Sequence, residues 1–284
     1  MVAALAPAEA TSGDLLRKPL VEAVLANRAT VVVLSRAAQA DEAVVAQAAA
    51  LHEAGVRVRT LSLFYEQWLG KLPVGELERV SLMFDVGGLH RARYGRLKRL
   101  VDLAAGLVGL IVLAVVTPFV WLGNLLGNRG PLLYRQVRVG RGGRQFVILK
   151  FRTMRPAAAQ ASEWTTRDDP RVTPFGRFLR VTHLDELPQV LNVLRGDLSI
   201  VGPRPEQPRY VEELVRKIPF YDLRHLVHPG ITGWAQVKYG YAGDERDALE
   251  KLQYDFYYLR HQRLALDARI MGRTLRAVIG RGGR

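Results

Sequence analysis

The sequence predicts an α+β protein that is mainly helical, with one β-hairpin, one long apolar helix and a small Rossmann-like β-α-β unit at the N-terminus. Three observations predict this fold class. Two short apolar runs enclose a helical pattern before residue 64, and an uncharged apolar stretch occupies residues 103–127. After residue 130, two segments of alternating apolar and polar residues flank a glycine-rich turn. Long segments whose apolar residues have helical spacing follow them. The 284 residues suffice for a hydrophobic core and one or two domains.

The N-terminal region, residues 1–88, is predicted to be a partial Rossmann-like unit with its linker. Residues 29–35 ("ATVVVLS") are typical of a buried strand, residues 41–55 of a helix with Gly55 as its C-cap, and residues 56–63 of a second strand. At best a frayed helix is expected before Ala29, and residues 64–88 are expected to be the linker. No glycine-rich loop joins the first strand to the helix, so dinucleotide binding is not expected.

The apolar stretch at residues 103–127 is long enough to cross a bilayer, which takes about 20 residues. Both flanks are strongly basic, although a single span is expected to have one basic side. Pro118 also interrupts the run, and proline bends or breaks a helix. Residues 89–128 are therefore predicted to form a basic flank and a re-entrant membrane helix, with a kinked transmembrane helix as the alternative. The flank before the stretch contains Arg91, Arg93, Arg96, Lys98 and Arg99.

The remaining residues, 129–284, are predicted to form the main domain. Residues 132–139 and 145–153 are typical of two strands of a β-hairpin, with "GRGG" as the turn. Residues 209–227 and 250–279 mix apolar, aromatic and basic residues at helical spacing. Such amphipathic helices either lie at a membrane interface or pack on the body of the domain, and the pattern alone leaves both open.

The charge balance narrows the class of partner. The formal net charge is +14 and the isoelectric point is about 10.4, which suits nucleic acid, an anionic membrane surface or phosphorylated substrates. The chain has no cysteine, which excludes disulfides and cysteine-based zinc sites. No histidine pair has the spacing of a metal-binding helix.

Two adjacent acids, Asp185 and Glu186, form the most distinctive candidate site. Pro188 is tolerated only in the first turn of a helix, so a helix is predicted over residues 188–195, ended by Gly196. The acids then lie at or just before its N-terminus, where backbone N–H groups and the helix dipole favour negative charge. Helix capping, worth about 1 kcal/mol, is the simpler interpretation of the pair.

Cations near this pair point instead to phosphate binding. Arg204 stands between two prolines, which restrict its backbone and pre-organise its guanidinium for a phosphate. Arg180 precedes the acids, and Lys150 and Arg152 end a predicted strand, so all three are candidate substrate-binding residues. Carboxylates among such cations also suit a Mg²⁺ ion bridged to a diphosphate. A carboxylate is in addition a possible covalent nucleophile toward phosphorus.

Several long motifs occur in one order: "LYRQVRVGRGGRQFVILKFRTM", "DPRVTPFGRFLR", "LDELPQVLNVLRGDLSIVGPRPE", "HPGITGWAQV" and "YDFYYLRH". Together they resemble the monotopic phosphoglycosyl transferases, the bacterial sugar transferases that start exopolysaccharide, O-antigen and glycoprotein assembly. The resemblance runs from about Arg91 to Arg276. It implies transfer of a sugar-1-phosphate from a UDP-sugar to undecaprenyl phosphate, with Mg²⁺ as cofactor and a covalent aspartyl phosphosugar intermediate.

The resemblance also implies residue roles. Asp185 falls on the family's nucleophile and Glu186 on its partner acid, and both are candidate metal ligands. Arg180, Arg204 and Asp255 fall on further family positions and are expected to bind substrate. Two positions depart from the family pattern: His228 stands where arginine or lysine is usual, and His183 where a small serine is common. His228 is kept as a candidate substrate-binding residue with a weaker phosphate contact.

The implied location is the cytoplasmic face of the bacterial inner membrane, with an anchor that does not cross. The implied partners are a UDP-sugar, undecaprenyl phosphate and anionic lipids attracted by the basic flanks, and a homodimer is compatible with them. A nucleic-acid-binding protein would fit the charge, but no recognisable module supports it. A non-catalytic membrane scaffold, in which the acids only cap a helix, is the other alternative.

Overall fold

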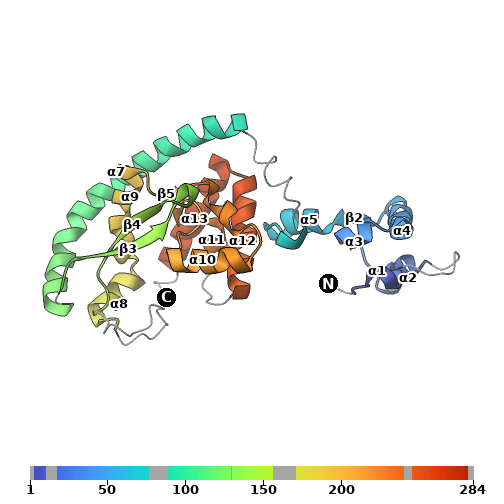
Figure 1. Cartoon of the computed structure of the whole chain (residues 1–284), viewed down its shortest axis with the longest axis horizontal. Helices are drawn as coiled ribbons and strands as arrows, with labels where there is room; N and C mark the ends of the chain where they lie inside the picture. Colours follow the sequence, from blue (N-terminus) through green and yellow to red (C-terminus); the bar gives the residue numbers. More distant parts are fainter. Residues whose placement is uncertain are drawn as a thin grey trace. The chain divides into compact units, whose positions relative to one another are not determined.

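The computed structural model describes residues 3–10, 18–76, 88–128, 130–155, 171–239 and 245–280, with the side chains of residues 88–92 and 279 excepted. Within it the chain forms two units, Met1–Asp85 and Val86–Arg284 (Figure 1). The first contains a small sheet with short helices, and the second contains the long apolar helix, a hairpin and most of the remaining helices.

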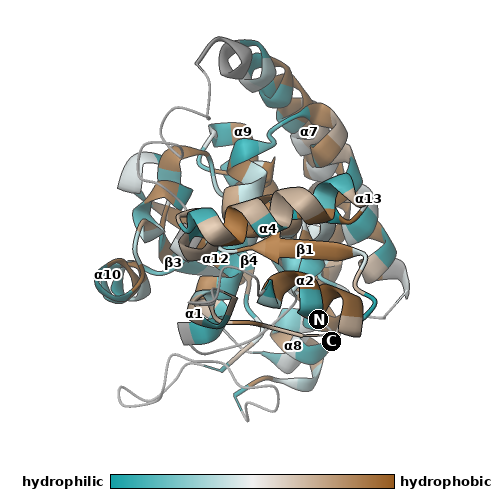
Figure 2. Cartoon of the chain, turned by 90° about the vertical axis from the view of Figure 1, so that its right-hand side faces the viewer, coloured by the Kyte–Doolittle hydropathy of each residue, from teal (hydrophilic) through white to brown (hydrophobic). Residues whose placement is uncertain are grey.

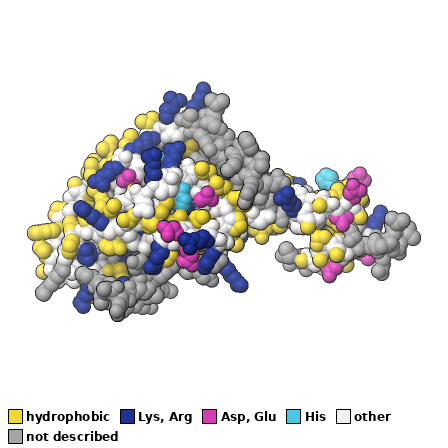
Figure 3. Space-filling view, viewed as in Figure 1, with side chains coloured by type: hydrophobic (Ala, Val, Ile, Leu, Met, Phe, Trp, Pro, Cys, Tyr) yellow, Lys and Arg dark blue, Asp and Glu magenta, His cyan; other side chains and the backbone are white. Residues whose placement is uncertain are grey.

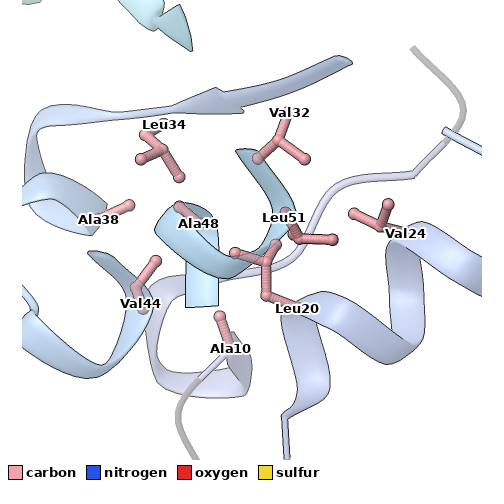
Figure 4. Close-up of a cluster of buried hydrophobic side chains, with 9 residues drawn as sticks. All are labelled: Ala10, Leu20, Val24, Val32, Leu34, Ala38, Val44, Ala48 and Leu51. Carbon is pink, nitrogen blue, oxygen red and sulfur yellow. The ribbon is translucent and has the colours of Figure 1, made fainter. Parts of the chain in front are cut away.

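The first unit contains the expected strand-helix-strand arrangement. Strands β1 (Val31–Leu34) and β2 (Arg57–Thr60) pair in parallel, and α4 (Glu42–Glu53) connects them. The Asp41 carboxylate caps α4 by accepting from the backbone N–H groups of Ala43 and Val44, and Gly55 follows its end with φ +89°. Strand β1 is hydrophobic along its length (Figure 2), and its buried side chains meet those of α4 in the core shown in Figure 4.

Two expectations for this unit are wrong. The second strand stops at Thr60, because the Thr60 hydroxyl accepts from Leu63 N–H and starts the helix α5 (Leu61–Phe64). The region before Ala29 is more than a frayed helix. Its helices α1 (Pro7–Ala10) and α2 (Pro19–Ala26) pack into the core, and buried Gln47 bonds to the backbone of both. The unit also contains the short helices α3 (Arg36–Gln39), η1 (Tyr65–Leu69) and η2 (Val74–Glu76). The linker expected at residues 64–88 is therefore partly helical before residue 77, and its residues 77–87 lie outside the described residues.

The second unit begins with α7 (Gly88–Gly127), a helix of 40 residues that curves along one side of the unit in Figure 1. The helix continues through Pro118, so the expected break is absent and the helix is curved instead. The Thr117 hydroxyl donates to the carbonyl of Leu113, at 2.6 Å, one turn before the proline. Such a bond from a threonine to the carbonyl four residues earlier often bends a helix, and Pro118 adds to the bend because it has no N–H for the carbonyl of Ala114.

The two faces of α7 differ in their surroundings. The inner face packs closely on the unit: a Cβ at Gly109 would lie 2.7 Å from Val190 Cγ1, and one at Gly123 would collide with the ring of Phe175. By length and composition the helix could cross a membrane, and only 11% of its most apolar window is buried. Hydrophobic side chains follow the outer edge of the unit in Figure 3. On α7 the most exposed hydrophobic side chains are Leu100, Val108, Ile111, Phe119 and Leu126.

The β-hairpin is confirmed. Strands β3 (Leu133–Val139) and β4 (Gln145–Phe151) pair antiparallel, with η3 (Arg141–Gly143) in the turn. The side chain of Asn192, which is fully buried, receives the N–H of Leu149 and donates to the carbonyl of Val147. This amide therefore fastens α9 (Val190–Arg195) to the second strand of the hairpin.

The remaining elements close the unit behind the hairpin. Strands β5 (Ser199–Val201) and β6 (Gly230–Thr232) pair in parallel. The two long helical segments are confirmed, but each divides. The first forms α10 (Pro208–Lys217) and η5 (Tyr221–Leu226), and the second forms α12 (Glu245–Arg260) and α13 (Leu264–Gly280). With the short α11 (Trp234–Lys238), α12 and α13 enclose a core that contains Trp234, Tyr258, Leu266 and Ile270.

Candidate active site

The acid pair lies in a 3₁₀ turn. Helix α8 (Pro174–Val181) ends before His183, which has a left-handed backbone with φ 56°, and the 3₁₀ helix η4 (Leu184–Gln189) follows. The expected helix start at Pro188 is therefore too late: the turn begins at Leu184, with Glu186 N–H bonded to the carbonyl of His183. This early start places Asp185 and Glu186 inside the turn, against the hairpin.

Glu186 is held by two cations. Its Oε1 accepts a hydrogen bond from Lys150 Nζ at 2.6 Å and lies 3.5 Å from Arg204 Nη2. Burial raises the pKa of this carboxyl, but the positive charges of Lys150 and Arg204 outweigh this effect and lower the pKa to about 2. Glu186 is therefore an anion at every physiological pH and links β4 to the Pro-Arg-Pro segment.

Asp185 differs from its neighbour. Among the residues that the structure describes, its carboxyl has no hydrogen bond and no ion pair, and the residue is half-buried. Burial and the adjacent Glu186 charge raise the pKa of Asp185 to about 6, although Lys150 and Arg180 partly oppose the shift. A half-buried carboxylate without a fixed partner retains its nucleophilicity and its capacity to bind a cation.

The Pro-Arg-Pro segment is held by its carbonyl oxygens. Two of its residues are prolines, which have no N–H to donate, so its backbone is bound mainly as an acceptor. Four successive carbonyls receive a hydrogen bond, each from a different donor group. The pairs are Pro203 with Gly230 N–H, Arg204 with Arg224 Nη2, Pro205 with Arg138 Nη1, and Glu206 with Val139 N–H. This arrangement fixes the backbone from which the Arg204 side chain extends.

A small pocket lies between these groups, lined by Arg138, Lys150, Glu186, Gln189, Arg204 and Gly230 among others. Arg138 was not among the predicted site residues. Its signal was available in the hairpin, because Gln136 pairs with Ile148 and Tyr134 with Lys150, so Arg138 shares the face of Lys150. Lys and Arg side chains gather across the face of the second unit shown in Figure 3.

The other predicted basic residues divide between the site and its surroundings. Arg180 donates through Nε to Thr153 Oγ1 at 2.9 Å and is close enough to Asp185 to lower its pKa. Arg152 donates through Nε to the carbonyl of Pro131 at 2.9 Å, in the loop after α7. Among the described residues no hydrogen bond or ion pair joins it to the acid pair. The structure thus brings Lys150, Arg180 and Arg204 together around the acids, and it places Arg152 elsewhere.

Asp255 and His228 also lie outside the pocket lining. Asp255 is fully buried in α12 and pairs with Arg224 Nη2 at 2.9 Å. The His228 Nε2 lies 3.3 Å from Arg141 Nη1, and burial together with Arg141 and Arg99 lowers the pKa of His228. The burial of Asp255 therefore does not support a direct contact with substrate. The lowered pKa makes His228 neutral at physiological pH, as expected from the sequence for a histidine at this position.

The two acids fit a Mg²⁺ ion to a limited extent. In the described part of the chain no group of three or more histidine, cysteine, aspartate or glutamate side chains could hold a metal. Mg²⁺ is however often held by one or two carboxylates together with substrate phosphates. Asp185 suits this role because its carboxyl has no ion pair with any described residue, whereas Oε1 of Glu186 is already engaged by Lys150.

The long apolar helix indicates membrane association, and the cationic pocket is a site suited to a phosphate ester. The comparisons with known proteins agree with this interpretation. A model of the bacterial sugar transferase family matches residues 93–281. The chain belongs to this family.

Relatives with assigned names are similar over most of this chain. An Aeromonas hydrophila UDP-N-acetylgalactosamine-undecaprenyl-phosphate N-acetylgalactosaminephosphotransferase is 42% identical over 74% of this chain and 53% of its own length. A Xanthomonas campestris UDP-glucose:undecaprenyl-phosphate glucose-1-phosphate transferase is 39% identical over 75% and 43%. A Caulobacter vibrioides protein of the same name is 39% identical over 74% and 82%. This chain therefore spans about half the length of the first two relatives.

Proposed function

We propose that this protein transfers a sugar-1-phosphate from a UDP-sugar to undecaprenyl phosphate, releasing UMP. The relatives' names support this general reaction, and the family match covers the whole site. The observation that carries the proposal is the contrast between the two acids. Glu186 is engaged by Lys150 and Arg204, while Asp185 beside it has no ion pair in the described residues. This reaction would be the first membrane step of a polysaccharide or glycoconjugate pathway.

The proposed chemistry has two displacements on one carboxylate. An Asp185 oxygen attacks the phosphorus that carries the sugar, the bond from that phosphorus to the UMP oxygen breaks, and UMP leaves. An oxygen of undecaprenyl phosphate then attacks the same phosphorus, and the Asp185 carboxylate is released with the lipid diphosphosugar as product. In each step one P–O bond forms and one breaks, and Asp185 is the only residue of this chain whose covalent bonds change.

The surrounding residues bind and orient the donor. Arg204 and Lys150 face the pocket and would neutralise the diphosphate oxygens, with Arg138 and Arg180 adding positive charge at its edges. Between catalytic turnovers, Glu186 holds the side chains of Lys150 and Arg204 in place. A Mg²⁺ ion held by Asp185, and to a lesser extent by Glu186, would supply further neutralisation of the diphosphate when bound.

We also propose that α7 is a re-entrant anchor on the cytoplasmic face of the inner membrane. Both of its ends contact the same unit: Tyr94 donates to Asp267 at 2.7 Å, and Asn128 donates to the carbonyl of Arg152 at 2.8 Å. A spanning helix would place its ends on opposite sides of a hydrocarbon layer about 30 Å thick. The exposed outer face of α7, with Phe178 of α8 near its C-terminal end, would face the lipid, and the basic flank would contact anionic headgroups.

The first unit is proposed to be the incomplete Rossmann-like part of a three-part chain: residues 1–88, the anchor at 89–128 and the catalytic part at 129–284. Its parallel strand pair supports the Rossmann-like assignment. None of the acids and cations of the candidate site belongs to it, which supports a non-catalytic role.

A panel of UDP-sugars with detection of released UMP tests the proposed function. Release with at least one donor, dependent on undecaprenyl phosphate for turnover and abolished in Asp185→Asn, is the expected result. A folded, membrane-bound protein that releases UMP from none of the donors would favour the scaffold alternative. The donor that is used would identify the sugar.

A further inference from the structure

The buried pair of Arg224 and Asp255 lies directly behind the Pro-Arg-Pro segment. Arg224 belongs to η5 and Asp255 to α12, and both side chains are almost completely shielded from solvent, at 6% and 2% exposure. A buried charge pair is costly to form, and replacing such pairs by apolar residues is often neutral or stabilising. Stability alone therefore does not explain a pair at this place.

The guanidinium of Arg224 makes three different contacts. Its Nη2 lies 2.9 Å from Asp255 Oδ2 and donates to the carbonyl oxygen of Arg204 at 3.0 Å, and its Nη1 donates to the Tyr221 hydroxyl at 2.6 Å. Asp255 compensates the charge and Tyr221 sets the orientation of the fork. The remaining contact goes to the backbone of the residue whose side chain reaches Glu186.

We propose that Arg224, oriented by Asp255 and Tyr221, is a positioning residue for the diphosphate-binding guanidinium of Arg204. This proposal rests on the proposed function for the identity of the ligand, but the positioning itself is a property of the free protein. It replaces the expectation that Asp255 touches substrate: Asp255 acts through Arg224 and the Arg204 backbone. A guanidinium that is displaced by about 1 Å loses much of its effect on a transition state.

The geometry requires an arginine at position 224. A planar guanidinium can bond an acid, a hydroxyl and a carbonyl in fixed directions, whereas a lysine ammonium is a single point on a flexible stem. Arg224→Lys keeps the charge opposite Asp255 and loses the fork. Tyr221→Phe keeps the ion pair and removes one orienting bond. Tyr239→Phe is the control, because it also removes a hydrogen bond from a tyrosine hydroxyl, to Asp247 Oδ1, away from this segment.

The first test is hydrogen exchange of the backbone amides in residues 199–207, measured by mass spectrometry on the full chain. In Arg224→Lys we expect exchange in this segment to rise about tenfold or more, with the hairpin at residues 133–151 unchanged. Tyr221→Phe should give a smaller rise, and Tyr239→Phe none. Unchanged exchange in both Arg224→Lys and Tyr221→Phe would overturn the proposal. If Arg224→Lys fails to fold, the exchange of this segment in Tyr221→Phe alone decides whether the proposal holds.

The second test is a double-mutant cycle on the binding of UDP in the presence of Mg²⁺. Arg224→Lys should weaken UDP binding about tenfold in the wild-type background and have no further effect in Arg204→Lys, because the group that it positions is already lost. Independent, multiplying effects would contradict the positioning role. A wild-type protein that does not bind UDP would count against the proposed function instead, and the exchange measurement would then decide the positioning role by itself.

Discussion

Lys150 Nζ lies 2.6 Å from Glu186 Oε1, while Asp185, one residue earlier, has no ion pair among the described residues. Two acids that are adjacent in the sequence thus have pKa values on opposite sides of their ordinary range, about 2 for Glu186 and about 6 for Asp185. The contact divides their roles. In the proposed reaction Glu186 organises the cations and Asp185 attacks the phosphorus.

Replacing Lys150 should impair the reaction by removing the cation that both acids share. Lys150→Gln takes a fixed positive charge from the donor pocket, so we expect kcat/KM for UMP release to fall about 100-fold or more. Arg152→Gln is the control, because Arg152 has a similar charge two residues away but bonds to the carbonyl of Pro131. It should stay within about fivefold of wild type, as expected for a peripheral charge. Equal losses in the two variants would mean that long-range charge, and not the Lys150 contact, matters.

The pH dependence of kcat/KM should show an acidic limb with an apparent pKa near 6. The pKa of Asp185 is raised to about 6 by burial and by Glu186, so below this pH the carboxyl is protonated and cannot attack. The rate should then fall about tenfold per pH unit. Glu186, with a pKa of about 2, stays ionised throughout.

Two changes should move this limb in opposite directions. Lys150→Gln should shift it to higher pH, because Lys150 lowers the pKa of Asp185 in the native protein. Higher Mg²⁺ concentration should shift it to lower pH, because a cation beside the carboxylate favours the ionised form. A limb that neither change moves would belong to another group.

The sequence predicted the local elements of the site well. The alternation in residues 132–153 and the "GRGG" turn identified the hairpin, and the acid pair with nearby arginines identified the pocket. The hairpin pattern depends on neighbours in the chain and is visible without the fold, whereas Lys150, Glu186 and Arg204 meet only in the fold. The expected break at Pro118 failed because packing of the inner face of α7 against α8 and α9 keeps the helix continuous.

Residues that act across the fold were missed or misplaced for a physical reason. Asn192, Arg138 and Arg224 have roles that depend on which backbone carbonyl lies beside them, and no local pattern encodes this. Asp255 was expected to bind substrate, but it lies in the interior with Arg224. The different partners of Asp185 and Glu186 also follow from the register of η4 against β4, which the sequence does not show.

The first unit should be dispensable for chemistry. Its core is formed by its own residues, and it contributes no residue to the acid pocket. A chain that begins at Val86 should therefore retain UMP release, with the Asp185→Asn form of the same chain as the inactive control. Loss of activity in a shortened chain that is folded and membrane-bound would show that the first unit supports catalysis.

The topology of α7 can be tested by cysteine labelling, since the chain has no native cysteine. Arg93→Cys and Gly130→Cys place single thiols at exposed positions near the two ends of the helix. For a re-entrant anchor, a membrane-impermeant maleimide should label both from the cytoplasmic side of oriented membranes and neither from the other side. Labelling of the two cysteines from opposite sides would establish a transmembrane helix.

Pro118→Ala, which restores the missing N–H, should straighten α7 and weaken its contact at Asn128.

The covalent intermediate on Asp185 is the most direct test of the chemistry. If Asp185 takes the phosphosugar before the lipid acceptor binds, UMP should appear without any acceptor, up to about one equivalent per active site. Steady-state kinetics should then show parallel lines for the two substrates. Asp185→Asn is nearly isosteric but a far weaker nucleophile, so the burst should vanish while UDP binding persists.

Glu186→Gln should keep a slower burst, because it loosens Lys150 and Arg204 without removing the nucleophile. A UDP-sugar labelled in the sugar should leave its label on a peptide that contains Asp185 in the wild type and in Glu186→Gln only. Intersecting kinetic lines with no burst, or a fully active Asp185→Asn, would mean that the sugar phosphate passes directly from donor to acceptor.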